Sequence, residues 1–132
     1  MGAFIDSSLC WEDIAWIREM VGPDMPLLIK GVQGAADARL AVRYGLHGIV
    51  VGNHGGRSLD TAPPAVMVLL ELRRECPEIF EKLEVLVDGG IRRGTDVLKC
   101  VCLGAKAVGL GRPPLYALGY GQEGVEHLVD SE

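Results

Sequence analysis

No apolar run in this sequence reaches the roughly 18–20 residues that a helix needs to cross a bilayer. The amino terminus lacks the basic and apolar regions of a secretory signal peptide, so we expect an intracellular protein. Aromatic residues make up only 5% of the chain and the net charge is −5, which is unlike the basic, aromatic-rich surface of a nucleic-acid-binding protein. We therefore expect neither a membrane segment nor a nucleic-acid partner.

Cysteine is also scarce: Cys10, Cys76, Cys100 and Cys102 are the four in the chain. The last two are separated by one residue, with no second cysteine pair and no histidine beside them. This spacing does not match a metal site, so we expect no metal and interpret the cysteines as buried, reduced thiols.

The composition is that of a globular protein. Apolar residues make up 48% and charged residues 23% of the 132 residues. A chain of this size fits one domain, here 1–132, and can bury a core.

Short apolar segments alternate with helical patterns along the chain. Ser7 and Ser8 are candidate caps for a first helix that ends at Gly22. The later helices and strands are delimited by glycine, proline and the apolar period. We predict strands over 26–32, 49–51 and 83–88, a last strand with its loop over 107–113, and helices over 35–44, 65–76 and 95–103, with another starting at Gln122.

This alternation favours a parallel sheet with helical crossovers. The run Ile49-Val50-Val51 is typical of a strand buried on both faces. A (β/α) barrel and an open doubly wound sheet both place ligands at the carboxyl ends of their strands, so position alone does not separate them. No G-x-G-x-x-G follows the first strand, which disfavours a dinucleotide site.

The loop after the second predicted strand carries a reactive pattern. His54 can change its charge near neutral pH, and Arg57 is a planar cation suited to a carboxylate or phosphate. Gly55 and Gly56 between them let the backbone approach a ligand closely. A base beside an anion-binding group suits chemistry on a small acid.

Two further glycine-arginine loops follow the last two predicted strands. Asp88-Gly89-Gly90-Ile91-Arg92 and Gly111-Arg112 both offer backbone N–H groups next to a guanidinium, which favours phosphate binding. Lys30, at the end of the first strand, either faces an anionic cofactor or pairs with Asp88.

These motifs resemble the FMN-dependent α-hydroxy acid dehydrogenases and oxidases, the family of glycolate oxidase, lactate oxidase and the cytochrome-linked L-lactate dehydrogenases. The resemblance rests on Leu28–Gln33, Asn53–Arg57, Asp88–Asp96 and Gly109–Pro113, and it runs over essentially the whole chain. It implies an α/β fold, a TIM-barrel half whose four parallel strands correspond to strands five to eight, and FMN as the cofactor. It also implies oxidation of an L-2-hydroxy acid to the 2-oxo acid, in a cytoplasmic, mitochondrial or peroxisomal setting.

The resemblance further implies a role for each matching residue. His54 matches the catalytic base, which takes a proton from the α-carbon or the hydroxyl, and Arg57 matches the arginine that binds the substrate carboxylate. Lys30 matches the lysine that stabilises reduced FMN. The FMN ribityl and phosphate contacts match Asp88, Gly89, Gly90, Arg92, Gly111 and Arg112.

Some of the family pattern is absent. Gly52 and Ser58 stand where many members have serine and glutamine. The family's first half, with its substrate-contacting tyrosines and the aspartate that orients the histidine, has no matching segment. The alternative is therefore a non-catalytic half-barrel or an FMN- or phosphate-binding module. Because four strands cannot close an eight-stranded barrel, we expect self-association or pairing with a complementary half.

Overall fold

The computed structural model describes residue 6 and residues 8–131. Its centre is a four-stranded sheet in the order β1-β2-β3-β4 with every neighbouring pair parallel, as the alternating pattern predicted. The strands are β1 (Leu28–Val32), β2 (Gly48–Val51), β3 (Glu84–Asp88) and β4 (Ala107–Gly109).

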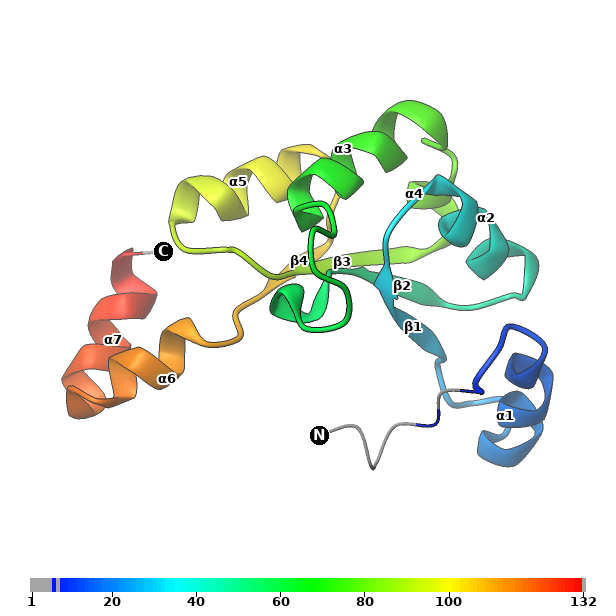
Figure 1. The fold of residues 1–132 in the computed structure, drawn as a ribbon, viewed down its shortest axis with the longest axis horizontal. Helices are drawn as coiled ribbons and strands as arrows, with labels where there is room; N and C mark the ends of the chain where they lie inside the picture. Colours follow the sequence, from blue (N-terminus) through cyan, green and yellow to red (C-terminus); the bar gives the residue numbers. More distant parts are fainter. Residues whose placement is uncertain (1–5, 7, 132) are drawn as a thin grey trace.

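Helices connect consecutive strands, and three of them cover one face of the sheet (Figure 1). These are α2 (Ala35–Arg43), α3 (Ala65–Glu75) and α5 (Gly94–Cys102). The remaining helices lie at the periphery of the fold: α1 (Asp13–Val21), α4 (Ile79–Lys82), α6 (Pro113–Leu118) and α7 (Gly121–Ser131). None of the helices within residue 6 and residues 8–131 is long and apolar enough to span a membrane.

The core lies between the sheet and the covering helices. Ile49, Val51, Val85 and Val87 point to the covered face and are at most 1% exposed. Leu69 and Leu72 of α3 are fully buried in the same cluster. Because side chains alternate along a strand, these residues share one face of the sheet. Burial of that face against the helices stabilises the fold.

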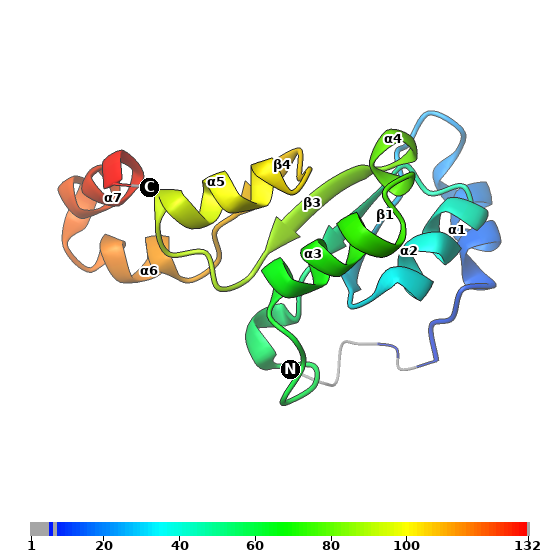
Figure 2. The same cartoon turned by 90° about the horizontal axis from the view of Figure 1, so that it is seen from above.

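The opposite face of the sheet is not covered by helices. Val50 and Leu86, whose side chains alternate with the buried ones, are only half-buried, and Leu28 is exposed. The turned view in Figure 2 shows α3 on one side of the strands. The prediction that the strand around Val50 is buried on both faces is therefore wrong, because within the described residues no element packs over its second face.

The predicted element boundaries mostly agree with the structure, and the differences occur at turns. Ser8 bonds Asp6 through its N–H and Oγ, at 2.9 and 2.6 Å, so it does not cap α1, which begins at Asp13 after Glu12. Ser7, the other candidate cap, lies outside the described residues. The final helix begins at Gly121, one residue before the predicted Gln122.

The cysteines fall into two groups. Cys76 and Cys100 are fully buried, whereas Cys10 and Cys102 are exposed. The expectation that all four are buried is therefore wrong for Cys10 and Cys102. Burial raises the pKa of the Cys76 and Cys100 thiols. Within the described part of the chain, no three histidine, cysteine or acidic side chains gather in a way that could hold a metal ion.

Candidate functional site

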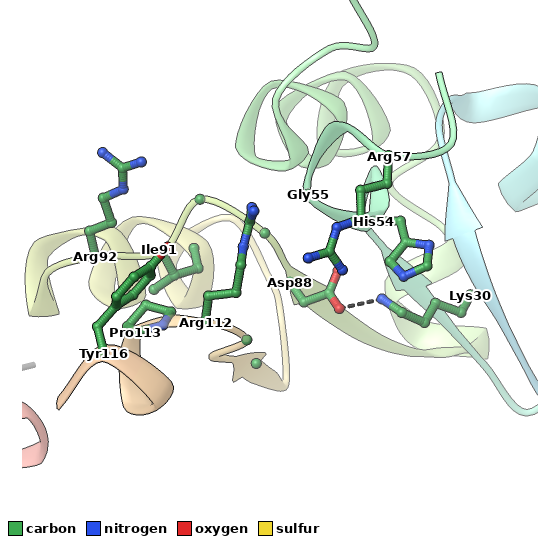
Figure 3. Close-up of a pocket in the computed structure, with 14 residues that line it drawn as sticks. Lys30, His54, Gly55, Arg57, Asp88, Ile91, Arg92, Arg112, Pro113 and Tyr116 are labelled. Atoms are coloured by element: carbon green, nitrogen blue, oxygen red, sulfur yellow. Dashed lines mark hydrogen bonds and ion pairs between the residues drawn. The ribbon is translucent and has the colours of Figure 1, made fainter. Parts of the chain in front are cut away.

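The carboxyl ends of all four strands open into one pocket of about 460 Å³. β1 contributes Lys30 from within the strand, and the other three strands contribute through their last residues or the loops that follow them, because parallel strands present the same end to one edge. Figure 3 shows this pocket. Every predicted site residue lines it: Lys30, His54, Arg57, Asp88, Gly89, Gly90, Arg92, Gly111 and Arg112.

Lys30 and Asp88 form an ion pair in the pocket, on the side where His54 and Arg57 lie (Figure 3). The side chains are 51% and 31% exposed, so the Lys30 ammonium is both paired and open to solvent. The β1–β2 register is irregular between Lys30 and Val32, where Gly31 has a φ of 93°. This bulge lets the strand turn away directly after Lys30.

His54 sits in an unusual backbone conformation. It begins a short 3₁₀ turn, η2 (His54–Gly56), with a φ of 56°, in the left-handed region that few residues other than glycine adopt. This conformation costs about 1–2 kcal/mol for a residue with a Cβ. The side chain is exposed and points into the mouth of the pocket beside Lys30 (Figure 3). Strain of this kind is common where a side chain must be aimed at a ligand.

The loops after β2 and β4 meet across the pocket. A Cβ built on Gly55 would lie 2.7 Å from Nη2 of Arg112. Gly55 also has a φ of 65°, so a side chain there would be both strained and in contact with the guanidinium. Glycine is therefore what allows Arg112 to reach across the pocket toward the His54 loop.

The loop after β3 is built to expose its backbone. Gly89 and Gly90 have φ values of 92° and 80° and open space where a Cβ of Gly90 would stand. The Arg92 N–H donates to Oδ2 of Asp96 at 3.2 Å, which fixes the loop to the first turn of α5. This bond lowers the pKa of the Asp96 carboxyl.

The pocket has more positive than negative charge. Asp88 is the carboxylate among its lining residues, against Lys30, Arg57, Arg92 and Arg112. Within the described residues the three arginines make no ion pair, since the two pairs found are Lys30–Asp88 and Lys99–Asp96. Such a pocket favours an anionic ligand.

The cations divide into two groups along the pocket. In Figure 3, Lys30, His54 and Arg57 point toward Asp88, whereas Arg92 points away from them near Ile91 and Tyr116. Arg112 lies between the groups. The structure therefore brings the predicted catalytic residues together, and it places the Arg92 guanidinium apart from them.

One lining residue lies outside the motifs found in the sequence: Tyr116. It lies on α6, and no helix was predicted between the loop ending at Pro113 and the helix starting at Gln122. Pro113 and Pro114 occupy the first positions of this helix, where proline is favoured. This proline pair was the sequence signal that could have located both the helix and the tyrosine.

Comparison with known proteins places this geometry in context. The family described as FMN-dependent dehydrogenase matches residues 1–131. L-lactate dehydrogenase (cytochrome) of Wickerhamomyces anomalus is 52% identical over 98% of this chain and 23% of its own length. Human 2-hydroxyacid oxidase 1 is 47% identical over 96% of this chain and 33% of its own length.

Solved structures agree with the sequence comparison. The flavin-binding domain of baker's yeast flavocytochrome b2 has a TM-score of 0.86 and 49% identity, covering 98% of this chain and 33% of that one. A mandelate oxidase structure gives a TM-score of 0.79 at 45% identity, over 92% and 36% of the two chains. The predicted α/β half-barrel with four parallel strands is thereby confirmed.

The chain spans between 22% and 35% of the length of the curated relatives it matches. The match nevertheless covers every strand and all the loops that form the pocket. The chain belongs to the FMN-dependent dehydrogenase family.

Proposed function

We propose that this chain binds FMN and contributes the catalytic rim of an enzyme that oxidises an L-2-hydroxy acid to the 2-oxo acid. The observation that carries the proposal is the convergence of Lys30, His54 and Arg57 on one side of a pocket rich in positive charge. Family membership supplies the reaction class, because relatives at about half identity are named as 2-hydroxy acid oxidases and lactate dehydrogenases.

The residues in the pocket fit an FMN molecule. The open space beside Gly90 and Gly111, and the arginines Arg92 and Arg112 without ion pairs among the described residues, suit its phosphate. Asp88 can accept hydrogen bonds from ribityl hydroxyls, because a carboxylate is an acceptor only. Bound FMN supplies a two-electron acceptor for the substrate.

Lys30, His54 and Arg57 have separate roles in this proposal. Arg57 binds the substrate carboxylate through its planar guanidinium and so fixes the orientation of the hydroxyl-bearing carbon. His54 accepts the proton that leaves the substrate at its imidazole nitrogen. Lys30 places a positive charge beside His54 in the pocket, where it stabilises negative charge on the reduced cofactor.

A second candidate, a half-barrel that binds FMN without turnover, is favoured by the uncovered face of the sheet. The chain spans 22–35% of its curated relatives, and the sheet face bearing Val50 and Leu86 has no covering layer among the described residues. Parallel sheets are otherwise covered on both faces. We propose that a second copy or a complementary half covers this face and pairs with the edges of β1 and β4.

Anaerobic reduction distinguishes the two functions. The chain is loaded with FMN and mixed with L-lactate or glycolate without oxygen, and the flavin absorbance is followed. Bleaching by L-lactate but not by D-lactate, lost in His54→Gln, is the expected result. Bound FMN that is never bleached supports the binding module, and a chain that takes up no FMN contradicts both.

Light scattering after size exclusion tests the pairing. We expect either a dimer or a marginally stable monomer whose unfolding is broad. A stable, cooperatively folding monomer contradicts the pairing proposal, whatever the outcome with FMN.

A further inference from the structure

We infer that Asn53 and Gln33 are positioning residues that hold the loop carrying His54 in its reactive conformation. This inference rests on the proposed function for its effect on the rate. The contacts that support it lie outside the group of residues assigned to FMN and substrate. They come from the ends of β1 and β2, directly before the histidine.

Asn53 ties the His54 loop at two points. Its Oδ1 accepts from the Gly56 N–H at 3.2 Å, and the same N–H lies 3.0 Å from the Asn53 backbone carbonyl. Its Nδ2 donates to the Pro63 carbonyl at 3.3 Å. An N–H needs an acceptor and a carbonyl needs a donor, so these two partners fix which way the amide faces. The side chain therefore bonds both the Gly56 N–H within the turn and the Pro63 carbonyl beyond it. We call these two bonds, together with the bond from Gln33 to Gly52, the clamp.

Gln33 fixes the residue before Asn53. Its Nε2, at the end of β1, donates to the Gly52 carbonyl of the neighbouring chain segment at 2.6 Å. Its Oε1 is buried and has no hydrogen-bond partner among the described residues. A buried acceptor without a partner is costly, so its presence calls for an explanation. The explanation we favour is that the Nε2 end of the same amide is needed for its bond to Gly52. Here the donor end holds the backbone of the His54 loop.

These bonds matter because His54 is not in a relaxed conformation. A φ of 56° is unfavourable for a histidine, so contacts with neighbouring residues must hold its backbone in that conformation. If the clamp is removed, the residue can relax to a right-handed φ, which swings the imidazole away from Lys30 and Asp88. Displacing a catalytic group by about 1 Å costs on the order of 100-fold in rate.

Two of the residues assigned to FMN are held by contacts outside this clamp: Lys30 pairs with Asp88 across the sheet, and Arg92 is tied to α5 through Asp96. Loss of the clamp should therefore slow proton removal much more than it weakens FMN binding. A residue with a purely structural role would lower both together.

Four variants provide the test, and two of them form a matched pair. Asn53→Ala removes both side-chain bonds, whereas Asn53→Ser keeps an oxygen that can accept from the Gly56 N–H. Gln33→Met removes the donor to Gly52 at similar length. Gln122→Met is the control, because Gln122 makes its 2.6 Å bond to Glu126 on the surface of α7. FMN affinity, the rate of anaerobic flavin reduction by L-lactate and the ¹³C shifts of His54, which report φ, are measured for each.

We expect Asn53→Ala and Gln33→Met to reduce flavin about 10–100-fold more slowly with a much smaller loss of FMN affinity. Asn53→Ser should lie between Asn53→Ala and the parent chain. The His54 shifts should move toward averaged values in Asn53→Ala and stay unchanged in Gln122→Met. Equal losses of rate and FMN affinity, or unchanged His54 shifts in Asn53→Ala, overturn the inference. If the parent chain reduces no flavin, the proposed function fails, and the His54 shifts alone decide the positioning roles.

Discussion

Lys30 and Asp88 form an ion pair although their strands, β1 and β3, are separated by β2. Lys30 is in register with Val50, which is in register with Leu86, two residues before Asp88. Residues two apart in a strand point to the same face, so Leu86 and Asp88 share one. The pair therefore spans β2 on the sheet face that no helix of the described residues covers, and both partners line the pocket.

The ion pair should matter for chemistry more than for stability. Lys30→Met should change the free energy of unfolding by less than about 1 kcal/mol, because the pair is well exposed to solvent. The same variant should slow anaerobic flavin reduction, since it removes the charge that stabilises the reduced cofactor. Urea unfolding and stopped-flow absorbance measure the two effects. Lys99→Met, which breaks the surface pair with Asp96, is the matched control and should leave the rate unchanged.

Arg57 should be intolerant of replacement by lysine. Lysine keeps the charge but cannot present two parallel N–H groups to a carboxylate. Arg57→Lys should weaken binding of the product analogue pyruvate by about 1.5–3 kcal/mol, the contribution of a hydrogen bond to a charged group. Perturbation of the bound flavin spectrum by pyruvate gives the affinity. Pyruvate affinity in Arg57→Lys equal to that of an Arg74→Lys control would remove Arg57 from the substrate site.

The thiols should react in a defined order. The Glu12 and Asp13 carboxylates raise the pKa of the exposed Cys10 thiol, so at a given pH less of it is in the reactive thiolate form. We expect alkylation of exposed Cys102 first and Cys10 second, with Cys76 and Cys100 protected until the chain unfolds. Timed iodoacetamide labelling with peptide mass spectrometry gives the order. Early labelling of Cys100 in the native chain would contradict the packing of α5 on the sheet.

Asp96 should make stability depend on pH in the acidic range. Its pKa lies below the ordinary 3.8, chiefly because it accepts the bond from the Arg92 N–H. A carboxyl whose pKa is lowered on folding stabilises the native chain above the unfolded pKa and loses that effect as pH falls through the folded value. Asp96→Asn should therefore be less stable than the parent near neutral pH, and the difference should shrink below pH 3.8.

Urea unfolding of both chains across that range measures the effect. Asp130→Asn on α7 is the control and should follow the parent at every pH. A difference between Asp96→Asn and the parent that stays constant down to the most acidic pH would show that the Arg92–Asp96 bond does not depend on the carboxylate charge.

The parallel sheet and the residues that line the pocket were predictable from the sequence, because both follow from local patterns. Apolar strand segments, helix-ending glycines and the loop motifs after each strand located Lys30, His54, Asp88 and Arg112 at one edge. A parallel sheet collects the residues after its strands whatever their spacing in the chain. The apolar pattern of β2 does not show which of its residues face the uncovered side, because Val50 is as apolar as its buried neighbours Ile49 and Val51.

The finer geometry of the site depends on contacts that no local pattern encodes. Nothing in the sequence around His54 specifies a φ of 56°, which results from bonds made by Asn53 and by the distant Gln33. The sequence left open whether Lys30 pairs with Asp88, and three-dimensional placement across β2 settles it. The separation of Arg92 from Lys30, His54 and Arg57 is likewise set by the course of the loop before α5.

Binding of FMN is measured by titrating FMN with the purified chain and following flavin fluorescence. We expect saturable quenching at about one FMN per chain, strongly weakened in Arg112→Met because the phosphate loses a charged hydrogen-bond donor. The Gln122→Met control should bind as the parent does. Flavin emission that stays constant at every chain concentration, or an Arg112→Met chain that binds as tightly as the parent, would contradict the account.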